Sequence, residues 1–465
     1  MKFLRRHPEI LILTGLAFIT RLWDVLHPAA VVFDEVYFKV YAGDYLTGSY
    51  YFDPHPPLGK LLLGAWAWLT HLDPANLTNT QDPSVALRLL PAIAGALIIP
   101  VFFVFLRQLG ASKRMATLGA ALLLLDNALM VESRFVLIDS MLILFGLGAV
   151  TCFLAARRRS GRVRIMLLVA AAVLAGMAAS TKWTGLSALG LIGIVWLSDI
   201  IRRRLTLNWH RIAEGVALIM IPFAVYASVF WIHFSLLPKS GQGDAFMSTR
   251  FQSTLVGNPN YDPKVHMGFW DKFNDLNVAM NQSEESLKTA THPYGSKWST
   301  WPIMYRDVYY WQGNTNEDGT QGNIYLLGNP VVWWGILVIL IAGSIASSTA
   351  LRRLRPFRFA LITLSVGYLM NYLPFSRITR VMFLYHYFFA LIYSLAFAVI
   401  LLGAFGDWTT DGPHPWKFSS RLSRNLYLGV LSLAVIGFIY FAPLSYGIPL
   451  TPVEISQHMW LPSWR

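Results

Sequence analysis

The sequence predicts an all-α protein that crosses a membrane many times. The chain has 465 residues, of which 55% are hydrophobic and only 14% are charged, whereas about 25% of the residues in ordinary soluble domains are charged. Apolar stretches long enough to cross about 30 Å of hydrocarbon recur along the chain. Short basic clusters separate these stretches. Together these observations predict a polytopic membrane protein with about eleven transmembrane helices and short interfacial helices in its outside loops.

Eleven apolar stretches define the expected spans, and the chain between them alternates in charge. The stretches lie near residues 9–26, 84–106, 115–131, 135–156, 165–181, 184–201, 212–234, 331–349, 358–375, 384–405 and 426–444. Six basic clusters fall on one side: Lys2/Arg5/Arg6, Arg107/Lys113/Arg114, Arg157/Arg158/Arg159/Arg162/Arg164, Arg202/Arg203/Arg204/Arg211, Arg352/Arg353/Arg355/Arg358 and Lys417/Arg421/Arg424. By the positive-inside rule, this pattern predicts a cytoplasmic N-terminus and a C-terminus on the outer side.

The charge and the cysteine content exclude other classes of protein. The net charge of +13 is dispersed over these clusters instead of being gathered in one domain, which argues against nucleic-acid binding. Cys152 is the only cysteine and lies in an apolar run. The chain therefore has neither an intramolecular disulfide nor a thiolate metal cluster.

Two long segments, residues 27–83 and 235–330, are expected on the outer side. The first contains residues 58–69, which are apolar and rich in Trp but too short to span, and this pattern indicates an interfacial helix. The second is too long for coil alone. Its region from Trp270 to Leu287 has apolar residues at helical spacing, which are Phe273, Leu276, Met280 and Leu287. We expect one or two surface helices there and no separate domain.

Ionisable residues gather just beyond the first span. Asp34, Glu35, Asp53, His55 and Lys60 place three carboxylates, an imidazole and an ammonium group at one membrane surface. Such a concentration in an apolar protein indicates chemistry. The alternatives are that the carboxylates solvate a loop or cap a helix, and that His55 is structural.

Several cations break the positive-inside rule because they lie at the outer ends of the expected spans. These are Arg21, Arg88, Arg134, Lys182, Arg377 and Arg380. Arg and Lys in a water-poor site stabilise phosphate charge. Snorkelling of each side chain to lipid headgroups is the alternative explanation.

Five blocks of sequence carry a family resemblance. They are Phe33-Asp34-Glu35, His55-Pro56-Pro57-Leu58-Gly59-Lys60, Arg134-Phe135-Val136-Leu137-Ile138-Asp139-Ser140, Lys182-Trp183-Thr184-Gly185-Leu186 and Arg380-Val381-Met382-Phe383-Leu384-Tyr385-His386-Tyr387. In this order they resemble the protein O-mannosyltransferase family. The resemblance implies the GT-C glycosyltransferase fold and transfer of mannose from a polyprenyl (dolichyl) phosphate to Ser or Thr hydroxyls. Because residues 235–330 have no room for the β-trefoil domain of eukaryotic members, the chain resembles the bacterial form.

The resemblance also implies roles for individual residues. Asp34 is the expected general base, and Glu35 would orient Asp34 or bind the acceptor or the sugar. Direct displacement predicts inversion, from a β-linked donor to an α-mannoside. The expected donor-binding residues are Arg88 and Arg380, then Lys60 and Arg134, together with His55, Arg21 and Lys182. Residues expected at the acceptor or behind the site are Asp53, Asp139, Tyr385, His386, Trp301 and Arg306.

No cofactor is expected, because the lipid-linked sugar is a substrate. Asp34, Glu35, Asp53 and His55 could supply metal ligands, but their spacing does not show that they converge, so no metal site is assigned and a divalent metal stays an open alternative. The expected partners are polyprenyl-phosphate-mannose, a Ser/Thr-containing polypeptide, membrane lipids and, as a further candidate, the secretion machinery. The expected location is the cell membrane, with the active site on the outer face.

Two alternative functions remain. A GT-C transferase could instead move a sugar from undecaprenyl phosphate to a lipid such as lipid A, although the His-Pro-Pro-Leu-Gly-Lys block favours a protein acceptor. A transporter would carry ionisable residues near the middle of its spans, a position that only Asp126 and Asp139 take here.

Overall fold

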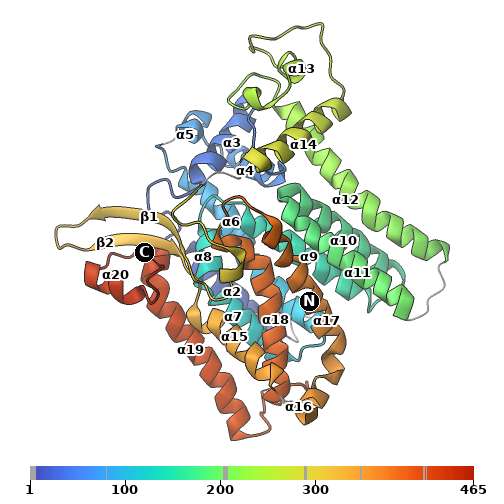
Figure 1. Cartoon of the computed structure of the whole chain (residues 1–465), viewed down its shortest axis with the longest axis vertical. Helices are drawn as coiled ribbons and strands as arrows, with labels where there is room; N and C mark the ends of the chain where they lie inside the picture. Colours follow the sequence, from blue (N-terminus) through green and yellow to red (C-terminus); the bar gives the residue numbers. More distant parts are fainter. Residues whose placement is uncertain are drawn as a thin grey trace.

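The computed structural model in Figure 1 is built mainly of long helices that pack side by side. The structure describes residues 7–79, 81–202, 208–286, 291–345, 348–411, 414 and 416–464. The helices up to residue 236 are α2 (Pro8–Leu22), α3 (Glu35–Thr47), α4 (Leu58–Leu69), α5 (Pro74–Thr78), η1 (Val85–Arg88), α6 (Leu89–Gln108), α7 (Lys113–Leu124), α8 (Asn127–Arg134), α9 (Asp139–Ala156), α10 (Gly161–Thr181), η2 (Trp183–Gly185), α11 (Leu186–Arg202) and α12 (Trp209–Leu236).

The remaining elements include one pair of strands. They are η3 (Asp244–Phe246), α13 (Thr249–Gln252), α14 (Phe269–Ser286), η5 (Trp298–Thr300), β1 (Val308–Thr315), β2 (Gln321–Leu326), α15 (Pro330–Ser344), α16 (Ser348–Arg353), η6 (Arg355–Phe357), α17 (Arg358–Met370), η7 (Leu373–Arg377), η8 (Leu384–Tyr387), α18 (Phe388–Phe405), α19 (Arg421–Tyr446) and α20 (Pro452–His458). Of the residues singled out above, Lys2, Arg5, Arg6, Arg203, Arg204 and Leu287 lie outside the described residues.

The predicted count of eleven spans is not confirmed. In the described part of the chain, eight helices are long and apolar enough to cross a membrane, or nine if α7 and α8, which meet at 58°, form one broken span. The other two predicted spans correspond to α2 and α15, which have 15 residues each. A helix of that length extends about 22 Å, which is less than the roughly 30 Å of hydrocarbon.

The most buried helices form the centre of the bundle. In α9 and α18, 78% and 83% of the apolar stretch that could span the membrane is buried inside the protein. The corresponding shares are only 22% in α12 and 28% in α19. The exposed faces of the outer helices carry large apolar side chains such as Ile219 and Ile436. Because apolar side chains are stable against lipid, this pattern fits a bundle whose rim faces a bilayer.

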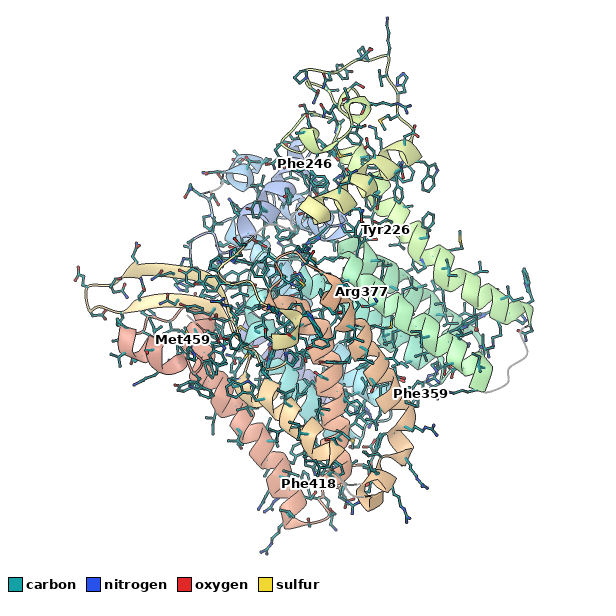
Figure 2. All side chains as sticks on the ribbon, in the orientation of Figure 1. Tyr226, Phe246, Phe359, Arg377, Phe418 and Met459 are labelled. Atoms are coloured by element: carbon teal, nitrogen blue, oxygen red, sulfur yellow. The ribbon has the colours of Figure 1, made fainter. Side chains whose placement is uncertain are left out.

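The described basic clusters meet at one end of the molecule, as the charge pattern predicted. Ion pairs join segments that are distant in sequence: Arg107 to Asp411 at 2.6 Å, Arg157 to Asp199 at 2.6 Å, Arg164 to Glu214 at 2.9 Å and Lys113 to Glu9 at 3.0 Å. Arg114 and Arg157 also lie over the rings of Phe418 and Phe359, both of which are labelled in the lower half of Figure 2. This region is called the basic end below.

The first and second outside segments meet at the opposite end, where α3, α4, α5, α13 and α14 gather (Figure 1). Helix α4 confirms the helix predicted at residues 58–69, and α14 confirms the one predicted from Trp270. The backbone N–H of Tyr50 donates to the carbonyl of Lys239 at 2.8 Å, which ties the two segments together. Figure 2 labels Tyr226 of α12, whose hydroxyl donates to Asn277 of α14 at 2.7 Å.

The second outside segment also contains a β-hairpin that the sequence analysis did not predict. Strands β1 and β2 pair antiparallel, with Val308 opposite Leu326, and the turn between them contains Gly319 at φ +78°. The aromatic run from Tyr309 to Trp311 suits a strand, but its outside position led us to expect helices alone. Among the described residues of 235–330, β1 and β2 are the only strands.

Candidate active site

A cavity of about 380 Å³ lies where the first outside segment meets α8, α9, η2 and the chain from Asn371 to Phe389. Seven of the predicted site residues line it: Asp34, His55, Asp139, Lys182, Arg380, Tyr385 and His386. The sequence blocks that carry the family resemblance therefore converge on one cavity, although they are spread over more than three hundred residues.

Asp34 reaches the cavity because of a turn just before α3. Phe33 has φ +49°, in the left-handed region that a bulky residue rarely adopts. Its ring stacks on Tyr310 of β1 at 4.4 Å between centroids, which holds this turn in place. Asp34 is the N-cap residue of α3, but its side chain accepts no capping hydrogen bond. The carboxylate is therefore directed to the cavity and does not serve as a helix cap.

The surroundings of Asp34 suit a proton acceptor. Burial raises the pKa of Asp34 to about 6, with Lys182 acting in the opposite direction and Asp139 and Asp53 adding to the increase. A carboxylate with a pKa near the working pH is ionised at pH 7 and more basic than an ordinary Asp, which are the properties of a general base.

Two cations line the same cavity. Lys182 follows the last residue of α10 in extended conformation, and its Nζ lies 2.7 Å from Oδ2 of Asp139, the first residue of α9. The Lys182 ammonium also lies 5.5 Å from the ring centroid of Tyr385. Arg380 lies between η7 and η8, and its Nη1 donates to the carbonyl of Val381 at 3.3 Å. This pair of charges can neutralise a phosphate in a water-poor site.

His55 lines the cavity as a neutral imidazole. Burial lowers its pKa to about 3, although Asp53 acts in the opposite direction. Asp53 and Lys60 stabilise the loop around His55. The backbone N–H of His55 donates to Asp53 Oδ1 at 2.6 Å, and Lys60 Nζ lies 2.9 Å from the same oxygen. Lys60 also donates to the His55 carbonyl. Asp53 and Lys60 therefore shape this loop but do not line the cavity.

Glu35 and Arg88, two further residues predicted for the site, lie away from the cavity. Both side chains are fully buried and form a bidentate ion pair, in which Arg88 Nε and Nη2 each donate to a Glu35 oxygen at 2.8 Å. The two Glu35 oxygens also accept the backbone N–H groups of Val32 and Val136, both at 2.9 Å. Neither residue lines the cavity. Since their polar atoms already have partners within the protein, the pair anchors the first outside segment to η1.

Arg134 and Arg21, which were also expected to bind the donor, lie outside the cavity as well. Arg134 donates to the carbonyls of Arg21, Trp23 and Asp24 at the end of α2 and lies 4.6 Å from the ring centroid of Tyr446. Arg21 donates to the Leu124 carbonyl at 3.3 Å. Both are 1% exposed and lie outside the cavity lining. They satisfy carbonyl groups at helix ends, which have no partner within their own helix.

Trp301 and Arg306 lie behind the site. Trp301 is fully buried and stacks on His386 at 5.9 Å between ring centroids, so it supports a residue that lines the cavity. Arg306 is half-buried outside the lining. Its charge opposes the burial that raises the pKa of Asp307 and Tyr294.

Four polar lining residues were not identified as site residues from the sequence: Glu132, Thr184, Asn281 and Asn371. Glu132 is 2% exposed, accepts a hydrogen bond from the Tyr310 hydroxyl at 2.6 Å and lies against the carboxyl group of Asp139. Its position two residues before Arg134 is the one signal in the sequence, but the sequence gives no sign of the 58° bend between α7 and α8. Among the described residues, no group of three or more His, Cys, Asp or Glu side chains could hold a metal ion.

Comparison with known proteins identifies the family. The family model for dolichyl-phosphate-mannose-protein mannosyltransferase matches residues 11–238, and the model for the C-terminal four-transmembrane region of protein O-mannosyltransferase matches residues 269–464. The chain is 32% identical over 330 residues to dolichyl-phosphate-mannose--protein mannosyltransferase 4 of Candida albicans, covering 67% of this chain and 42% of that protein. It is 31% identical over 349 residues to mouse protein O-mannosyl-transferase 1, covering 70% and 45% respectively.

Solved structures agree on the fold. The S. cerevisiae Pmt1-Pmt2 complex, described as bound to the sugar donor, superposes with a TM-score of 0.87 at 20% identity over 100% of this chain and 93% of that chain. The oligosaccharyltransferase AglB from Archaeoglobus fulgidus gives 0.54 at 12% identity over 96% and 56%. Both likenesses support the predicted GT-C fold. The chain spans less than half the length of the curated relatives named above. Because the two family models together match most of its residues, the chain belongs to the protein O-mannosyltransferase family.

Proposed function

We propose that the protein transfers mannose from a polyprenyl-phosphate carrier of the dolichyl type to Ser or Thr hydroxyls of polypeptides. The observation that carries this proposal is the placement of Asp34, Lys182 and Arg380 in one cavity. A hydroxyl acceptor needs a base, and a phosphate leaving group needs cations. The names of the relatives, which specify dolichyl-phosphate-mannose and protein, support the choice of substrates.

In the proposed reaction, the acceptor oxygen attacks C1 of mannose while Asp34 takes the hydroxyl proton. The bond from C1 to the phosphate oxygen breaks, and the carrier phosphate leaves with the electron pair. Lys182 and Arg380 balance the charge that develops on the leaving phosphate. Because one displacement inverts the anomeric carbon, a β-linked donor gives an α-mannoside.

The proposed location of this reaction is the outer face of the cell membrane. The basic end, where the described clusters meet through their ion pairs, would lie in the cytoplasm by the positive-inside rule. The two outside segments, of which the first carries Asp34 and the second carries Lys297, would then face outward. Secreted or membrane polypeptides are within reach there.

The test is transfer of radiolabelled mannose from synthetic polyprenyl-phosphate-mannose to a Ser/Thr-rich peptide by the purified protein. We expect Asp34→Asn to lower transfer by at least about 100-fold, which is the lower range for loss of a general base. Asp44→Asn is the matched control. Asp44 also belongs to the α3 region, and burial raises its pKa to about 6 as well. It accepts a hydrogen bond from the Gln242 side chain and does not line the cavity.

Each outcome of this assay discriminates between functions. Loss of transfer in Asp34→Asn with retention in Asp44→Asn supports both the reaction and the base. Label that appears on a lipid acceptor but not on the peptide would move the assignment to a lipid-modifying transferase. No transfer from any polyprenyl-linked sugar would contradict the proposed enzyme.

A further inference from the structure

A second cavity adjoins the candidate active site. It has a volume of about 460 Å³ and lies between residues 291–299 and residues 376–382. Ile378 and Arg380 line both this cavity and the one that contains Asp34. A chain bound in the second cavity therefore lies directly beside the reacting groups.

The two walls of this cavity are held close together. The backbone N–H of Ser296 donates to the carbonyl of Met382 at 2.8 Å. Gly295 makes this approach possible, because a Cβ atom at that position would lie 2.8 Å from Val381 Cγ2 and would force the side chain to move. The cavity is thus bounded by two segments with a defined spacing.

The lining of the second cavity suits a polypeptide better than a lipid tail. Hydroxyl groups line it from both walls, namely those of Thr291, Ser296, Ser299, Ser376 and Thr379. Ser296 Oγ already accepts a hydrogen bond from Trp301 Nε1 and Ser376 Oγ donates to the Leu373 carbonyl, so the other three are the main candidates for bonding to a ligand. Hydroxyl groups can bond to the N–H and C=O groups of an extended chain, whereas an acyl or prenyl tail offers no hydrogen-bonding partner. This chemistry favours a peptide backbone as the occupant.

The charge of the lining is positive. Lys297 and Arg380 both contribute to it, and among the described lining residues there is no Asp or Glu. Lys297 is exposed, so its ammonium group is accessible to a ligand in the cavity. A carboxylate is the side chain that complements such a surface.

We propose that this second cavity, the acceptor groove, binds the acceptor polypeptide beside the modified Ser or Thr and selects an acidic residue opposite Lys297. The inference rests on the proposed function and adds a sequence preference to it. A cavity of about 380 Å³ is about 9 Å across if it is treated as a sphere, and an extended chain advances about 3.3 Å per residue. The selected acidic residue therefore lies about three residues from the acceptor hydroxyl.

The experiment compares peptides that share one Thr and carry Glu, Gln or Lys three residues before or after it. We measure binding of fluorescent peptides to the full-length protein by anisotropy, and kcat and KM for transfer in parallel. On one side of the Thr, the Glu peptide should bind about fivefold more tightly than the Gln peptide, which is the size expected for one exposed ion pair. In Lys297→Glu the preference should reverse to the Lys peptide, and the change should appear in the dissociation constant and the KM for peptide.

Lys264→Glu is the control for a change in overall charge, because Lys264 is an exposed lysine of the same outside segment that does not line the groove. It should keep the preference for Glu. Equal affinity for the three peptides, or a preference that Lys297→Glu does not alter, would overturn the proposal. A raised KM for donor in Lys297→Glu with unchanged peptide selectivity would overturn it as well and would assign the groove to the lipid carrier. Charge-selective binding without any transfer would leave the groove in place and contradict the proposed reaction instead.

Discussion

Asp34 and Glu35 are adjacent in the sequence but have different environments. The left-handed turn at Phe33 directs Asp34 to the cavity, whereas Glu35 faces the buried Arg88. From the sequence, Asp34 was expected to act as the base and Glu35 to orient Asp34 or bind the acceptor or the sugar. The structure places only Asp34 in the cavity lining, and the roles of both residues stay predictions. Arg88 is 53 residues from Glu35 along the chain, so no local pattern could reveal their pairing.

The raised pKa of Asp34 leads to a prediction about pH. Below a pH of about 6 the Asp34 carboxyl group is protonated in the folded protein and cannot accept the acceptor proton. We expect kcat/KM for peptide to fall about tenfold for each unit of pH below this value and to be level above it, at least to pH 8. The neutral imidazole of His55 does not titrate in this range, since its pKa is lowered to about 3.

The measurement is the pH profile of transfer from about pH 3.5 to pH 8 at saturating donor. Asp44→Asn serves as the control, because loss of another carboxyl group on α3 should not displace the profile. An acid limb centred near pH 4 would contradict the environment described for Asp34, since it would match an ordinary Asp.

At the scale of elements, the Glu35–Arg88 pair joins the start of α3 to η1 and so holds the first outside segment against α6. Breaking a buried ion pair by removing one partner typically costs about 3–5 kcal/mol, because the other charge remains buried without compensation. We expect Arg88→Met to destabilise the protein by about this amount. Adding Glu35→Gln to Arg88→Met should then restore part of the lost stability, because the remaining charge is removed.

Thermal unfolding of the purified variants in detergent checks this expectation, with donor binding measured alongside it. If the double variant regains stability and binds donor as the native protein does, the pair is structural. If Arg88→Met instead unfolds at the same temperature as the native protein but loses affinity for the donor, Arg88 contacts the carrier phosphate. That was the role first predicted from the sequence.

Elements with strong hydrophobic periodicity could be predicted from the sequence, and elements fixed by distant partners could not. The apolar run 58–69 and the helical spacing from Trp270 gave α4 and α14 nearly to the residue. The hairpin was missed although Tyr309 to Trp311 favour a strand, because its stability depends on packing such as the stack of Tyr310 on Phe33. Glu132 could not be predicted as a site residue for the same reason, since its position depends on contacts with distant residues.

At the scale of the whole molecule, the basic clusters and the cavity lie in different parts of the structure. The described basic clusters meet at one end through their ion pairs, while the cavity lies where the two outside segments meet α8 and α9. The alternating basic clusters led to the expectation of such a separation, because every second crossing returns the chain to the same end. Which end is cytoplasmic stays a prediction. The number of crossings was less certain from sequence, since α2 and α15 have only 15 residues each.

The proposed orientation can be tested with the single native cysteine removed. Cys152→Ala leaves a background without thiols, into which Lys297→Cys or Ser160→Cys is introduced. Both positions are exposed, Lys297 in the outside segment and Ser160 at the basic end between α9 and α10. A membrane-impermeant maleimide should label Lys297→Cys in intact cells, and should label Ser160→Cys only after the membrane is opened, because basic loops are retained in the cytoplasm. Ser160 is chosen so that no basic residue is lost. The reverse labelling pattern would place the cavity on the cytoplasmic face and rule out secreted polypeptides as acceptors.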